Sequence, residues 1–85
     1  MADDQVTVEI RITGYVQGVG FRANTRRRAA GLGLTGTAEN RDDGSVLVRM
    51  SGPREAVDAM IAWCRQGPPA AHVTGLEVTE LPVGR

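Results

Sequence analysis

The strongest constraint on the fold is a strand pattern that passes through a glycine-rich segment into a helix pattern. Apolar and polar residues alternate over residues 6–13, which is the period of a half-buried strand. The segment from Gly14 to Gly20 has the composition of a tight turn. Residues 22–32 are rich in Arg and Ala, lack Pro and end before Gly33, which predicts a helix. A helix between two strands is a crossover connection, so the first strand should run parallel to the second.

The middle of the chain predicts a β-hairpin. Residues 35–41 form a weaker strand pattern, because Gly36 and Ala38 are poor strand formers. Asp43-Gly44 is a hairpin signal, and residues 45–51 continue as the partner strand. The residues of this strand that should face the core are Val46, Val48 and Met50.

A second helix should follow the hairpin. Pro53 suits the first helical position, with Ser51 or Gly52 as the cap. An apolar stripe at helical spacing predicts the buried side of this helix, and it consists of Ala56, Val57, Met60, Ile61 and Cys64. The residues Gly67 to Pro69 should end it.

The last strand is expected to start at Leu76 and Val78, and the different phase of Leu81 and Val83 predicts a bulge or kink. The resulting order is β-α-β-β-α-β. It indicates an α+β fold, a ferredoxin-like split βαβ sandwich in which two helices cover one face of an antiparallel sheet. A chain of 85 residues should form a single domain over residues 1–85, with residues 1–5 as a loose tail.

Composition excludes several functions. The formal net charge is zero, which argues against a nucleic-acid binder. The chain has no Lys, so the nucleotide P-loop motif cannot be formed. A single cysteine, Cys64, excludes an internal disulfide or a multi-cysteine metal site. The sequence shows neither a signal-peptide pattern nor an apolar run approaching the ~20 residues of a membrane span, so we expect a cytoplasmic protein that does not bind membranes.

The glycine-rich segment is a candidate phosphate site. Inward-facing N–H groups at the start of a helix bind anions, and Arg22 would add a planar guanidinium that suits phosphate oxygens. The predicted topology brings the ends of the first and second strands to one edge of the sheet, where Asn40 would lie near Arg22.

Other interpretations of this segment are weaker. Residues 18–23 match a G-x-G-x-x-A dinucleotide fingerprint, and Asp42 or Asp43 follows at about the right distance, but the chain has too few strands for a doubly wound sheet. A non-catalytic anion-binding module would not need Asn40. An RNA recognition domain would need aromatic residues on the sheet, and the chain has one Phe, one Tyr and one Trp.

The residues from Gly14 to Arg22, G-Y-V-Q-G-V-G-F-R, meet the signature G-x-V-Q-G-V-G-F-R, and the sequence strongly resembles the acylphosphatase family. Residues 40–46 match a second signature, N-x-x-D-G-x-V, and residues 67–73 resemble a late G-P-P-x-A-x-V segment. The resemblance extends from about Val6 to Glu80. It departs from the family at Asn24 and Thr37, where aromatic residues are common, and we interpret these changes as affecting acyl-group preference or packing.

The resemblance implies hydrolysis of the carboxyl–phosphate anhydride of a small acyl phosphate, giving a carboxylate and inorganic phosphate. It assigns phosphate binding and catalysis to Arg22, and orientation of the attacking water to Asn40. The loop that holds the phosphate is expected to consist of Tyr15, Val16, Gln17, Gly18, Val19, Gly20 and Phe21. No metal or organic cofactor is expected. We expect a monomer, and we expect inorganic phosphate or sulfate to compete with the substrate. His72 is expected to have no catalytic role, because the substrate's own phosphate should accept the proton of the attacking water.

Overall fold

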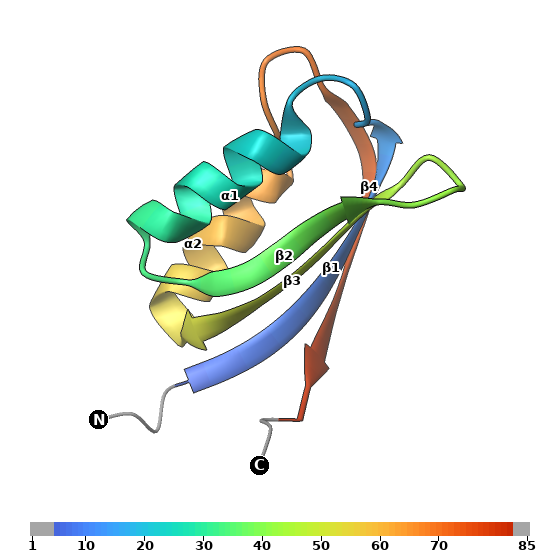
Figure 1. Cartoon of the computed structure of the whole chain (residues 1–85). Coiled ribbons are helices and arrows are strands. Elements are labelled where there is room, and N and C mark those ends of the chain that lie inside the picture. The colour runs from blue at the N-terminus through green and yellow to red at the C-terminus, as the bar shows by residue number, and fades with distance from the viewer. Residues whose placement is uncertain (1–4, 83–85) are drawn as a thin grey trace.

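The computed structural model describes residues 5–82 (Figure 1). The elements in chain order are β1 (Gln5–Tyr15), α1 (Phe21–Gly31), β2 (Thr35–Asn40), β3 (Val46–Pro53), α2 (Arg54–Cys64) and β4 (His72–Leu81). The four strands form one sheet in the order β2-β3-β1-β4, and every neighbouring pair is antiparallel. Because β3 lies between them, β1 and β2 run parallel, as the crossover helix requires.

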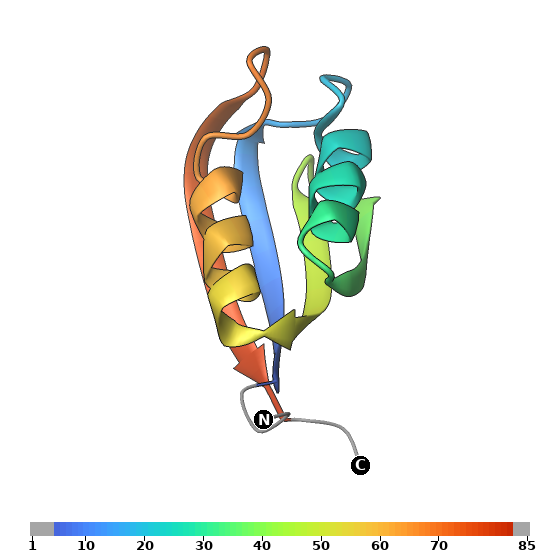
Figure 2. The same cartoon turned by 90° about the vertical axis from the view of Figure 1, so that its left-hand side faces the viewer.

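Both helices cover the same face of the sheet, and the other face is open (Figures 1 and 2). The predicted βαββαβ order and ferredoxin-like arrangement are therefore confirmed. The loop before α1 and the loop before β4 lie at the same end of the molecule, beside the turn between β2 and β3 (Figure 1). This end is the sheet edge at which the sequence placed the site.

The alternating apolar residues of β1 form part of the hydrophobic core. These residues, Val6, Val8, Ile10 and Ile12, are buried beneath the helices. The predicted inward residues of β3, Val46, Val48 and Met50, are also buried. The helices contribute the buried side chains of Phe21, Val57, Met60 and Cys64. The burial of Cys64 raises the pKa of its thiol to about 12.

The ends of the strands differ from the prediction. Gln5, which was assigned to the tail, is the first residue of β1 and pairs with Pro53. The last strand starts at His72, four positions before Leu76, because it pairs with the end of β1 at Tyr15. The register irregularity lies at Thr13 and Gly14, so the prediction of a bulge between Val78 and Leu81 was wrong. The prediction for Val83 lies outside the described residues.

The helix ends also differ in detail. Helix α1 starts one residue earlier than expected, at Phe21. Pro53 is the N-cap of α2 and not its first helical residue, and Ser51 and Gly52 belong to β3. The extended backbone of Pro53 (φ −59°, ψ 142°) allows β3 to pass directly into α2. Within residues 5–82, neither helix has the length and apolar character needed to cross a bilayer.

Candidate active site

The glycine-rich loop is anchored in the core at both ends. Val16 and Phe21 are each 1% exposed, and the Phe21 ring packs against Trp63 of α2 with ring centroids 5.4 Å apart. Between these anchors the chain makes two left-handed turns, at Gly18 (φ 76°) and Gly20 (φ 81°). Residues with a Cβ rarely adopt this conformation, so the two glycines determine the shape of the loop.

The loop leaves a set of N–H groups available as donors. Within residues 5–82, the backbone N–H groups of residues 17–23 donate to no backbone or side-chain acceptor. Three of these residues form the first turn of α1, where N–H groups have no partner within the helix. The first turn of α1 also contains no acidic residue, so the partial positive charge of the helix N-terminus is not offset there.

Arg22 is the second residue of α1 and is exposed. Within the described part of the chain its guanidinium has neither a hydrogen-bond acceptor nor an ion-pair partner. The turn before it is closed by Asn24, whose backbone and side-chain N–H groups both donate to the Gly20 carbonyl, at 3.0 Å and 2.8 Å. The fold therefore fixes the helix start while leaving the Arg22 side chain uncommitted.

Asn40 is the last residue of β2 and directly precedes the turn to β3. That turn is held by Asp43, which accepts hydrogen bonds from the Ser45 hydroxyl (2.6 Å) and amide (2.9 Å) and an ion pair from Arg11 of β1. The Ser45 hydrogen bonds, followed by those from Arg11, hold the pKa of Asp43 well below its usual range. The turn that follows Asn40 is thus fixed to the neighbouring strand at neutral pH.

Gln17 joins the loop to the same turn. Its side-chain Nε2 donates to the backbone carbonyls of Arg41, at 2.8 Å, and Ser45, at 2.9 Å. The Gln17 side chain is therefore used within the protein, which agrees with a structural role in the loop.

A cavity of about 150 Å³ lies where these elements meet. It is lined by Val16, Gly18, Gly20, Phe21, Arg22, Ala23, Arg26 and Asn40. The structure thus brings both residues expected to be catalytic, and four of the seven loop residues, to one cavity. The other three, Tyr15, Gln17 and Val19, do not line it, and Tyr15 is 65% exposed at the end of β1.

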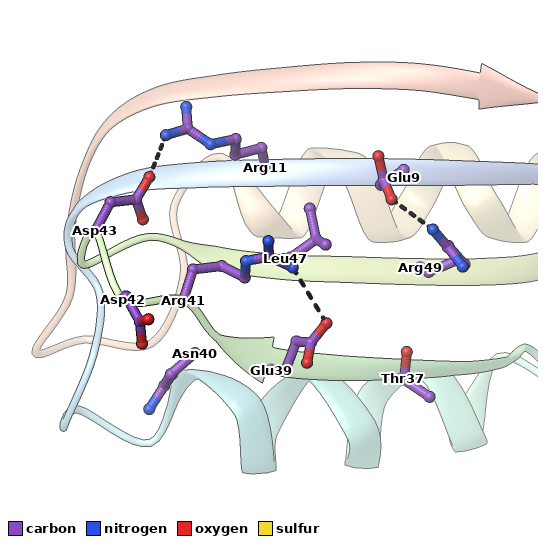
Figure 3. Close-up of a pocket in the computed structure, with 10 residues that line it drawn as sticks. All are labelled: Glu9, Arg11, Thr37, Glu39, Asn40, Arg41, Asp42, Asp43, Leu47 and Arg49. Atoms are coloured by element: carbon purple, nitrogen blue, oxygen red, sulfur yellow. Dashed lines mark hydrogen bonds and ion pairs between the residues drawn. The ribbon is translucent and has the colours of Figure 1, made fainter.

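A larger depression of about 790 Å³ covers the open face of the sheet (Figure 3). Several of the charged residues that line it form ion pairs with one another: Arg49 with Glu9 at 2.7 Å, and Arg41 with Glu39 at 3.5 Å. Four carboxylates and three guanidiniums line it, whereas the smaller cavity has two guanidiniums and no carboxylate. An anion is favoured in the smaller cavity. Asn40 borders both, but Figure 3 shows its side chain directed away from the ion pairs and toward the turn before α1.

Comparison with known proteins identifies the family. The sequence model of the acylphosphatase family matches residues 8–84. The chain belongs to the acylphosphatase family. An acylphosphatase from Methylococcus capsulatus is 51% identical over 76 residues, which cover 89% of this chain and 83% of that one. Acylphosphatase structures from Coxiella burnetii and Bacillus subtilis align with TM-scores of 0.92 and 0.88 and identities of 31% and 36%. They cover 98% and 92% of this chain, and 87% of each of those chains.

This assignment makes the chain a hydrolase of acyl phosphates and confirms the function and fold class expected from the sequence. The two departures from the acylphosphatase pattern lie outside the small cavity. Asn24 closes the start of α1, and Thr37 of β2 borders the depression on the open face. Within residues 5–82, no group of three or more His, Cys, Asp or Glu side chains could hold a metal ion.

Sequence reasoning missed two residues that line this acylphosphatase cavity, Ala23 and Arg26, of which only Arg26 carries a charge. Arg26 belongs to the run 26–28, which was interpreted as a solvated helix face. The structure places it on the cavity wall, where its guanidinium donates to the Ala38 carbonyl at 3.3 Å. The available signal was its spacing, since residues four apart on a helix share one face and Arg22 was already assigned to the site. Arg28, in contrast, lies 5.1 Å from the centre of the Trp63 ring.

Proposed function

We propose that this acylphosphatase binds the phosphate of its substrate in the loop from Tyr15 to Phe21, with Arg22 and Asn40 as its catalytic residues. The observation that carries the proposal is the small cavity, which is lined by Arg22, by Asn40 and by loop residues, and by no carboxylate. Within residues 5–82, the N–H groups of this loop and the Arg22 guanidinium have no acceptor in the protein. N–H groups at a helix start and an Arg fork are the donors that a phosphate dianion accepts.

The chemistry demands little more than this. Transfer of the phosphoryl group from an acyl phosphate to water passes through a loose transition state, with charge spread over the equatorial phosphate oxygens. Donors that are already in place stabilise this charge without reorganising. The loop amides and Arg22 supply such donors. Arg26, on the same helix face, adds a second positive charge to the cavity wall.

Asn40 orients the water. An amide does not titrate near neutral pH, so Asn40 accepts one hydrogen bond from the water and donates another, without acting as a base. The proton of the water passes to the substrate phosphate as the P–O bond to the carboxylate breaks. His72 is exposed at the start of β4 and does not line the cavity, so the pH profile of kcat should be unchanged in His72→Ala.

Several wider properties follow from the same site. The donors recognise a tetrahedral anion, so inorganic phosphate and sulfate compete with substrate, and a chelator leaves activity unchanged because no step uses a metal. We also propose a monomer, since within residues 5–82 the large exposed apolar residues are limited to Tyr15 and Val78. A cytoplasmic location agrees with the reduced, buried Cys64.

Steady-state hydrolysis of benzoyl phosphate tests the assignment. We expect Arg22→Ala to lose both phosphate binding and turnover, and Asn40→Ala mainly to lower kcat, by roughly 10²–10³. Arg65→Ala is the control, because Arg65 is an exposed arginine directly after α2 that does not line the cavity. An Asn40→Ala enzyme with wild-type kcat would remove the water-positioning role. Equal losses in Arg22→Ala and Arg65→Ala would remove the role of Arg22.

A further inference from the structure

The bridge between Gln17 and the β2–β3 turn is made by a single amide nitrogen that donates to two backbone carbonyls. Gln17 Nε2 carries two hydrogens, and it lies within hydrogen-bond distance of two carbonyl oxygens, those of Arg41 (2.8 Å) and Ser45 (2.9 Å). A carboxylate at this position would place acceptors against acceptors, and an apolar side chain would leave the bridge unmade.

The two carbonyls are also the acceptors that close the turn. The Arg41 N–H donates to the Ser45 carbonyl at 2.8 Å, and the Gly44 N–H donates to the Arg41 carbonyl at 3.1 Å. Gln17 therefore binds the turn at the two points that determine its shape. The turn directly follows Asn40, whose pairing with Val46 is the last of the β2–β3 ladder. Beyond that pair, the Gln17 bridge connects this backbone to the loop that carries Gly18 and Gly20.

We propose that Gln17 is a positioning residue that sets the distance between the phosphate loop and Asn40. Its side chain acts through the backbone of Arg41, the neighbour of Asn40, and does not contact the substrate. The loop and the turn come from separate parts of the chain. The alignment of the water held by Asn40 with the phosphate held by the loop therefore depends on the rigidity of the Gln17 bridge. This inference rests on the water-positioning role proposed above for Asn40.

Kinetic measurements separate positioning from binding. Loss of alignment by about 1 Å can cost on the order of 10²-fold in rate, so we expect Gln17→Ala to lower kcat roughly tenfold to a hundredfold. The inhibition constant of inorganic phosphate should change little, because the loop donors and Arg22 remain. Gln17→Met, which keeps the length of the side chain and lacks both donors, should reproduce the loss even if Gln17→Ala fails to fold. Gln66→Ala, at an exposed glutamine after α2, is the control and should match the wild type.

A double-mutant cycle tests whether Gln17 acts through Asn40. If it does, the Gln17→Met loss in kcat should nearly vanish in an Asn40→Ala background, since there is no oriented water left to misplace. Equal factors in both backgrounds would overturn the proposal. A weaker phosphate inhibition constant with unchanged kcat would also overturn it, because this would make Gln17 a ligand contact.

Amide hydrogen exchange keeps this test distinct from the proposed function. The exchange of the Arg41 and Gly44 N–H groups should accelerate in Gln17→Met, because both share their acceptors with Nε2. Unchanged exchange at both groups would show that Gln17 does not hold the turn, and would refute the inference whatever the kinetics. Accelerated exchange together with a wild-type kcat in Asn40→Ala would instead reject the role of Asn40, and the positioning role of Gln17 with it.

Discussion

Replacement of Phe21 should weaken both the fold and phosphate binding, because this side chain anchors the loop to the core. Phe21 directly precedes Arg22 and is 1% exposed. Its ring packs on Trp63 and against the backbone of Gly67, where an added Cβ would lie 2.5 Å from Phe21 Cε2. Trp63 and Gly67 are themselves held in place by the fold. They can therefore move only partly into the cavity that truncation of Phe21 would leave.

The magnitude follows from this burial. Truncation of a buried Phe to Ala typically costs about 3–5 kcal/mol. A domain of this length has a total free energy of unfolding of roughly 4–13 kcal/mol, at about 0.05–0.15 kcal/mol per residue. Phe21→Ala should therefore lose about a quarter or more of the stability. It should also raise the inhibition constant of inorganic phosphate, since the loop end and the Arg22 backbone are no longer fixed.

The assay is urea unfolding followed by circular dichroism, combined with phosphate inhibition at a temperature at which all variants are folded. Leu34→Ala is the control, because Leu34 is 6% exposed and lies between the C-terminal end of α1 and the start of β2, away from the loop. Its truncation should cost about 2–5 kcal/mol as well but leave the inhibition constant unchanged. A loss of less than ~1 kcal/mol in Phe21→Ala would refute the packing argument. Equal inhibition constants in both variants would refute the link between the anchor and the site.

Two further predictions concern buried side chains. Within residues 5–82, the Thr25 hydroxyl is buried without a hydrogen-bond partner, so Thr25→Val should raise the free energy of unfolding by about 1 kcal/mol in the same urea assay. A lower value would indicate that the hydroxyl is satisfied. Burial raises the pKa of Cys64 to about 12, above the value of about 8.5 of an unfolded thiol. The folded state thus retains a proton that the unfolded state loses, so stability from this thiol is present below about pH 8.5 and declines from there toward pH 12. Cys64→Ala should lack this additional alkaline decline in urea titrations at several pH values, and an identical decline in both proteins would contradict the assignment.

Elements with a local pattern could be predicted from the sequence. The alternation from Val6 to Ile12 and the stripe around Met60 each require one buried side, and the structure buries them. The start of β4 could not be predicted in this way. Residues His72 to Gly75 form a strand because they pair with the end of β1, and such pairing between distant segments leaves no periodic signal in a short polar stretch.

The site shows the same division. The meeting of Arg22 and Asn40 follows from topology alone, because a crossover helix makes β1 and β2 parallel. The bridge from Gln17 to the turn could not be inferred, since it depends on the path of the loop, which turns left-handed at Gly18 and Gly20 directly after Gln17. Arg26 was accessible to reasoning through its spacing from Arg22, but a run of three arginines on a helix resembles a solvated face.

The central claim is that the loop amides and Arg22 together hold a tetrahedral anion, and an NMR titration with inorganic phosphate tests it most directly. In ¹H–¹⁵N spectra, the amides of residues 17–23 should shift together and saturate at one dissociation constant, and Arg22→Ala should abolish this saturation while the spectrum remains that of a folded protein. Loop amides that do not respond, or saturable shifts confined to the open face around Arg11 and Arg49, would contradict the account.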